Sequence, residues 1–203
     1  SEAKFEVPSL MPQTDIFHTA VATARGGSAY LLVDALRYEM ARELVTVLDA
    51  EWAAELAPAL ATPPTITEVG MAALLPGAER GMALKASSSG KLTPVIDGKA
   101  LRTRQDRVTY FQQTMAGKSV TVKLDQLAPL TAMLFTIYLA AAELILVTAT
   151  EEIDGLCETN PTLARRMMDD VLNQLRRGIG TLFGLGVGTV VITADHGYLF
   201  GDK

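Results

Sequence analysis

The sequence predicts an α/β fold, built on a mostly parallel sheet that helices cover on both faces. Apolar runs of strand length alternate along the chain with segments whose apolar residues recur at helical spacing. The strand-like runs are continuously apolar, which is typical of parallel strands buried on both sides. With 203 residues, 49% of them hydrophobic, the chain is long enough for one domain with a sizeable core.

The first strand is predicted at SAYLLV, residues 28–33, and it ends at Asp34. A helix is expected next, because apolar residues recur four apart: Leu36, Met40, Leu44 and Leu48. After ATPPT, the segment TITEVGMAALLPG predicts a short helix that begins near Thr67 and ends before Pro76.

Two more strands and a long helix are predicted in the second half of the chain. LILV, residues 144–147, has strand length, and Asn160-Pro161 is typical of the cap and first residue of a helix. Apolar spacing continues this helix to about Phe183, where several glycines follow. GTVVITADHG then predicts a last strand that ends at Asp195-His196.

The stretch before LILV has the composition of a membrane span, since Glu143 is the only charged residue between Asp125 and Glu151. We interpret it as a buried helix from Pro129 through LTAMLFTIYLAAA, followed by the strand, because a lone glutamate in mid-span is costly. No membrane association is expected.

A basic segment, residues 85–123, interrupts the pattern. It carries eight basic residues against two acidic ones, in a chain whose net charge is −5. We interpret it as a solvated insertion or cap within a single domain of residues 1–203, with a polyanion-binding surface as the alternative. The overall acidic charge argues against a generally basic nucleic-acid-binding surface.

Cysteine content and the first twenty residues indicate a cytoplasmic setting. Cys157 is the only cysteine, which excludes an intramolecular disulfide. The first twenty residues contain no basic region followed by an apolar run, so no secretion signal is predicted.

Acidic residues follow three of the expected strands: Asp34, Asp154 and Asp195, the last with His196. Ligands gather at the carboxyl ends of parallel strands, so these positions are candidates for a site. Each aspartate taken alone is better explained as a turn former or a helix cap than as part of a site. Together with an imidazole and a hydroxyl, they are what a divalent metal with an activated nucleophile requires.

Thr67 is the hydroxyl placed to take part. It lies near a helix N-terminus, whose backbone N–H groups also favour a bound phosphate. From spacing alone, the alternative stays open that Thr65 and Thr67 only cap that helix.

Four segments in order, VDALRYEMARELV, PTITEVGMAALLPG, EEIDGLCE and VVITADHGYLF, resemble the PglZ domain. That family is a branch of the alkaline phosphatase superfamily associated with bacterial phage-defence (BREX) systems. The resemblance runs from Ser28 to Phe200, although residues 85–123 contribute little. The motifs that are most specific for the family are DALRYE and, later in the chain, TADHG. It implies an alkaline phosphatase-like sandwich.

The resemblance also implies a first metal site. In the superfamily, one metal is held by an Asp after the first strand, a nucleophilic Thr or Ser, and the Asp-His of a DHG motif. The matching positions are Asp34, Thr67, Asp195 and His196. The segment around Thr67 has the length and register of the phosphodiesterase branch, which selects Thr67 over Thr65. The expected ion is zinc, with manganese or magnesium as alternatives.

A second metal in such enzymes usually takes an Asp, a His four residues later, and another His nearer the C-terminus. Here Asp154 is followed by Glu158, a carboxylate that favours a harder ion. No third ligand is found, because eight residues follow Asp195 and His18 precedes the first strand. We therefore expect a fragment truncated at its C-terminus, with weak metal binding and weak activity.

The expected function is metal-dependent phosphoryl transfer, of the phosphodiesterase or nuclease-like kind, in phage defence. Thr67 would attack a phosphate ester, nucleic acid or nucleotide included, and other defence proteins would be partners. The alternative is a catalytically impaired, hydrolase-like domain that serves as an interaction module in a defence complex. A metal-free nucleotide-binding module ranks last, since no GxGxxG or Walker-type loop follows the first strand.

Overall fold

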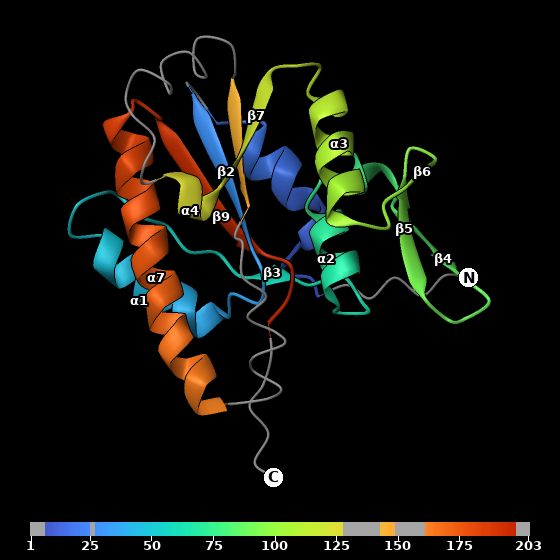
Figure 1. Ribbon diagram of the computed structural model, residues 1–203, viewed down its shortest axis with the longest axis horizontal. Helices are drawn as coiled ribbons and strands as arrows, with labels where there is room; N and C mark the ends of the chain where they lie inside the picture. Colours follow the sequence, from blue (N-terminus) through green and yellow to red (C-terminus); the bar gives the residue numbers. More distant parts are fainter. Residues whose placement is uncertain (1–6, 25–26, 128–142, 149–160, 198–203) are drawn as a thin grey trace.

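The computed structural model describes residues 7–24, 27–127, 143–148 and 161–197. Among them, four strands form a parallel sheet in the order β7-β8-β2-β9 (Figure 1). These strands are β2 (Ser28–Val33), β7 (Ser119–Lys123), β8 (Leu144–Thr148) and β9 (Thr189–Ala194). The α/β fold class and the expected strands at 28–33, at 144–147 and before Asp195 are confirmed.

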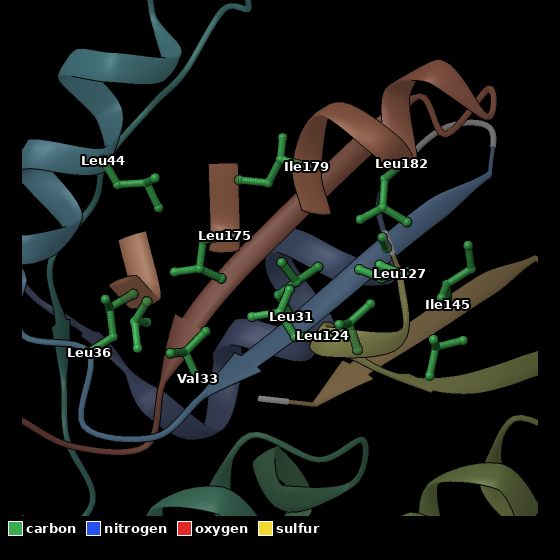
Figure 2. Packing of buried hydrophobic residues seen from close by; sticks show 14 of the residues in the cluster. Leu31, Val33, Leu36, Leu44, Leu124, Leu127, Ile145, Leu175, Ile179 and Leu182 are labelled. Atoms are coloured by element: carbon green, nitrogen blue, oxygen red, sulfur yellow. The ribbon is translucent and has the colours of Figure 1, made fainter. Parts of the chain in front are cut away.

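One face of the sheet is covered by α1 (Tyr38–Leu48), α4 (Leu124–Leu127) and α7 (Pro161–Gly184) (Figure 1). Leu31 and Ile145 of the sheet pack there with Leu175 and Ile179 of α7 (Figure 2). Burying an aliphatic side chain of this size stabilises the fold by about 2 kcal/mol. The four-residue spacing along α1 is confirmed, because Met40, Leu44 and Leu48 are all buried.

The other face is covered by α2 (Thr67–Ala73), α3 (Arg104–Thr114) and a short π-helical turn, η2 (Phe17–Val21). Phe17 packs edge-to-face against Tyr30 of β2 and Phe111 of α3. The Tyr30 hydroxyl donates to the Leu74 carbonyl oxygen at 3.0 Å, which fixes the end of α2 against the central strand. The expected cover on both faces is therefore confirmed.

Smaller elements lie beside this sandwich. Strands β4 (Ala83–Ala86), β5 (Leu92–Ile96) and β6 (Lys99–Ala100) form an antiparallel sheet, and β1 (Met11–Pro12) pairs with β3 (Ala59–Leu60). Two 3₁₀ turns complete this part: η1 (Gln13–Asp15) and η3 (Ala78–Arg80).

The basic segment 85–123 contributes to both parts of the molecule. It forms most of the antiparallel sheet, then α3, and finally β7, which is an edge strand of the main sheet. Its basic residues are therefore spread over a small sheet, a helix packed on the main sheet and a strand within it.

Two expected features lie outside the described residues: the helix over 129–142 and the Asn160 cap. Where the structure describes the chain, no helix is long and apolar enough to cross a membrane. Strand β9 is half-buried throughout, unlike the fully buried β2 and β8, because it lies at the end of the sheet.

Candidate metal centre

Strand register brings Asp34 and Asp195 together. Val33 is paired with Ala194 at the ends of the neighbouring parallel strands β2 and β9, so the residues that follow lie side by side. Ligand atoms of Asp34, Asp195 and His196 all lie within 4.8 Å of one another, and all three residues are buried. The sequence placed these residues at one edge of the sheet, and the geometry agrees.

Backbone donors hold the Asp195 carboxylate in position. Its Oδ1 accepts hydrogen bonds of 2.9 Å from the backbone N–H groups of Ala35 and His196. Ala35 has a φ of 52°, which non-glycine residues rarely adopt, so the turn after β2 is strained to make this bond. The other carboxylate oxygen of Asp195, Oδ2, has no hydrogen bond within the described residues and lies 3.3 Å from His196 Nε2.

The His196 ring presents Nε2 to the site. Its Nδ1 lies 3.2 Å from the Gly197 carbonyl oxygen, which only accepts, so Nδ1 carries the proton. In the neutral ring, Nε2 then offers a lone pair, which is the form that binds a metal. Asp34 Oδ1 lies 3.8 Å from this Nε2. Ligand atoms in a tetrahedral zinc site are about 3.3 Å apart, so these spacings fit a divalent cation.

Thr67 is the first residue of α2, and it completes the cluster. Its Oγ1 lies 3.2 Å from His196 Nε2. No side chain caps α2, so the reading of Thr67 as only a helix cap is not supported. Thr65 is exposed. The structure thus brings together Asp34, Thr67, Asp195 and His196.

The electrostatics of the cluster favour a cation. Burial raises the pKa of the Asp195 carboxyl, whereas the Ala35 and His196 N–H groups, the imidazole and Asp34 act in the opposite direction. Two carboxylates buried this close together repel each other, and a cation bound between them would offset that cost. The donor set of two carboxylates, one imidazole and one hydroxyl therefore fits a divalent ion by its chemistry.

Two positioning residues were missed by sequence reasoning. The buried Gln13 donates from Nε2 to the carbonyl oxygens of Ala194 (3.0 Å) and Asp195 (2.6 Å), and its Oε1 accepts from Thr62 N–H. Gly70 lies so close that a Cβ there would be 2.3 Å from the Asp195 carbonyl oxygen. A glycine one helical turn after Thr67 was a possible signal for the close approach; a lone glutamine gave none.

The expected second metal pair, Asp154 and Glu158, lies outside the described residues. His18 is exposed on η2 and takes no part in the cluster. In the part of the chain that the structure describes, three possible metal ligands come together at one place: Asp34, Asp195 and His196.

Comparison with known families agrees with this geometry. Residues 20–203 match the model of the family described as the BREX system PglZ alkaline phosphatase-like domain. A search of curated proteins finds no match. The matched segment contains the main sheet and all four clustered residues, so this chain belongs to the PglZ family of alkaline phosphatase-like domains of BREX systems.

Proposed function

We propose that this domain is a metal-dependent phosphodiesterase that acts in phage defence with Thr67 as its nucleophile. The observation that carries the proposal is the 3.2 Å separation of Thr67 Oγ1 from His196 Nε2 beside two buried carboxylates. Asp34, Asp195, His196 and Thr67 would hold a divalent cation, zinc first among the candidates. Such an ion supplies positive charge that lowers the pKa of a bound hydroxyl and neutralises phosphate oxygens.

The residues of the chain then have distinct roles. Thr67 Oγ1 forms a bond to phosphorus as its proton passes to solvent, and the ester oxygen leaves as an alcohol after taking a proton from solvent. Water cleaves the resulting phosphothreonine. Gln13 and the Ala35 N–H hold Asp195, and the Gly197 carbonyl orients His196.

The proposal extends to parts that the described residues do not include. Asp154 and Glu158 are proposed as ligands of a second, harder ion. Nucleic acid or a nucleotide is the proposed substrate in the cytoplasm, with other defence-system proteins as partners. The family membership supports a defence role of a hydrolase-like domain.

The test is cleavage of bis-para-nitrophenyl phosphate with zinc, manganese or magnesium. Thr67→Ala is compared with Thr65→Ala, which removes an exposed hydroxyl two residues away. We expect metal-dependent turnover that falls by about a thousandfold or more in Thr67→Ala and stays unchanged in Thr65→Ala. Equal rates in wild type and Thr67→Ala would remove the nucleophile assignment. Absence of turnover with every metal would favour the interaction module.

A further inference from the structure

Helix α3 carries a partly buried arginine that the proposed reaction does not yet use. The Nη1 atom of Arg107 is shielded from solvent and has no hydrogen-bond partner among the described residues. A guanidinium loses much of its hydration in such a place, and a buried donor left unsatisfied costs about 1 to 3 kcal/mol. A shielded, unsatisfied Nη1 donor on this cation therefore calls for a ligand.

The position of Arg107 is set by its neighbour one turn earlier. Arg104 Nη2 donates to the Thr148 hydroxyl at the carboxyl end of β8. Residues three apart share a helix face, so Arg107 lies on the side of α3 that faces this edge of the main sheet. Thr148 pairs with Leu32, two residues before Asp34. The face of α3 that carries Arg104 and Arg107 thus lies at the carboxyl end of the main sheet, where the candidate metal centre is.

Charges around Arg107 connect it to the nucleophile. Burial lowers the pKa of the Arg107 guanidinium, and the positive charge of Arg104 lowers it further. The negative charges of Glu68 and Asp195, and more weakly that of Asp106, raise it. Glu68 directly follows Thr67 in the first turn of α2. Arg107 is therefore within electrostatic reach of both the Thr67 turn and the metal centre.

Among the described residues, the acids nearest to Arg107 along the chain are engaged elsewhere. Asp106, the nearest acid along α3, is engaged in the capping box: its Oδ2 accepts from Thr103 N–H at 2.9 Å, and Thr103 Oγ1 accepts from Asp106 N–H. Arg80, by contrast, is fully committed to Glu79 and Asp97.

We propose that Arg107 binds the non-bridging oxygens of the phosphate group presented to Thr67. This inference rests on the proposed phosphodiesterase function and assigns it a substrate-binding residue from the basic segment. A guanidinium donates two parallel N–H groups to phosphate, which suits the unsatisfied Nη1. The segment expected to be a solvated cap thus supplies part of the binding site.

The test measures binding of inorganic phosphate to the metal-loaded protein by calorimetry. Wild type is compared with Arg107→Gln, with Arg107→Lys, and with Arg102→Gln, which removes the same charge from an exposed position of the same segment. We expect phosphate affinity to fall about ten- to a hundredfold in Arg107→Gln. The fall should be smaller in Arg107→Lys, which keeps charge but loses the fork, and absent in Arg102→Gln.

Thermal melting of the metal-free protein separates this role from a structural one. Because Arg107 Nη1 has no hydrogen-bond partner among the described residues, Arg107→Gln should melt no lower than wild type, whereas loss of a structural ion pair would lower the melting temperature. Unchanged phosphate affinity in both Arg107 variants would overturn the proposal, as would a wild type that binds no phosphate. If Arg107→Gln does not fold, Arg107→Lys decides.

Turnover distinguishes failure of this inference from failure of the proposed function. Phosphate binding that depends on Arg107, in a protein that cleaves no diester, would retain the arginine site and remove the phosphodiesterase. Diester cleavage with the same KM in wild type and Arg107→Gln would retain the enzyme and remove the arginine site.

Discussion

Two aspartates of this molecule lie in opposite electrostatic surroundings. Asp97, in the turn between β5 and β6, has its Oδ2 at 2.9 Å from both the Tyr110 hydroxyl and Arg80 Nη2. The Tyr110 hydroxyl and the Arg80 guanidinium hold the pKa of the Asp97 carboxyl below its usual value. Asp195 is fully buried, and burial raises its pKa.

The difference separates a structural cluster from a candidate functional one. Around Asp97, protein donors and a cation compensate the carboxylate, so the group needs nothing else. Around Asp195, a second buried carboxylate and an imidazole gather their ligand atoms within 4.8 Å, an arrangement that is typical of functional sites. Three changes test this contrast.

The largest effect is expected from Gly70→Ala at the metal centre. The added Cβ would meet the Asp195 carbonyl oxygen at 2.3 Å and its carbonyl carbon at 2.7 Å, so the α2 and β9 backbones must separate. We expect a loss of about 3 kcal/mol in unfolding free energy, with weakened metal binding. Urea denaturation and metal titration measure both.

Gly184→Ala is the matched control, because a Cβ at the end of α7 meets no atom within 4 Å. This substitution should leave metal binding unchanged and raise the free energy of unfolding by up to about 1 kcal/mol. If Gly70→Ala retained wild-type stability and metal affinity, the close packing of α2 on Asp195 would not matter to the site.

A smaller effect is expected from Tyr110→Phe in the compensated cluster. The Tyr110 hydroxyl also lies 2.9 Å from the Pro76 carbonyl oxygen, so its removal takes a donor from that buried carbonyl and leaves Asp97 Oδ2 with Arg80 as its side-chain donor. The free energy of unfolding should fall by about 1 kcal/mol, measured by denaturation, and metal affinity should stay unchanged. A loss of metal binding would contradict the separation of the two regions.

The same variant has a pH signature. Burial and the bond to Asp97 raise the pKa of Tyr110 from 10.0 to about 12. A raised folded-state pKa contributes stability that is present below pH 10 and lost as pH rises through about 12. Wild type should therefore lose stability in this alkaline window more steeply than Tyr110→Phe. Tyr30, whose pKa burial also raises, is common to both proteins.

The smallest effect is expected from Arg80→Gln. Arg80 is more than half exposed, and solvent screens its bonds to Glu79 and Asp97. Its removal should destabilise the protein less than Tyr110→Phe, and high salt should reduce the difference from wild type. Melting curves at low and high salt check this. A loss larger than that of Tyr110→Phe would show that Arg80 is the main partner of Asp97.

The sequence predicted most of the fold and the clustering of the candidate metal ligands, for identifiable reasons. The continuous apolar runs at residues 28–33 and 144–147 are the two buried strands, and the four-residue spacing along α1 is its buried face. Asp34, Asp195 and His196 follow strands directly, so parallel pairing alone brings them together.

Contacts between distant segments escaped prediction. Gln13 reaches Asp195 across 182 positions, and nothing in the local pattern around Gln13 indicates that contact. Similarly, Arg107 lies in a segment that we interpreted as a solvated insertion. The packing of that segment on the main sheet depends on the pairing of β7 with β8, which the local sequence pattern does not show. Such placements follow from tertiary topology and not from local periodicity.

We propose that Asp34, Thr67, Asp195 and His196 form a divalent-cation site. Titration of the metal-free protein with zinc, comparing wild type, Asp195→Asn and Asp97→Asn, tests it most directly. We predict that Asp195→Asn weakens zinc binding by more than about a hundredfold, because changes outside the first ligand sphere alone can cost that much. Asp97→Asn should bind zinc as wild type does. Equal zinc affinity in wild type and Asp195→Asn would show that Asp195 is not a ligand and would contradict a cation site at this cluster.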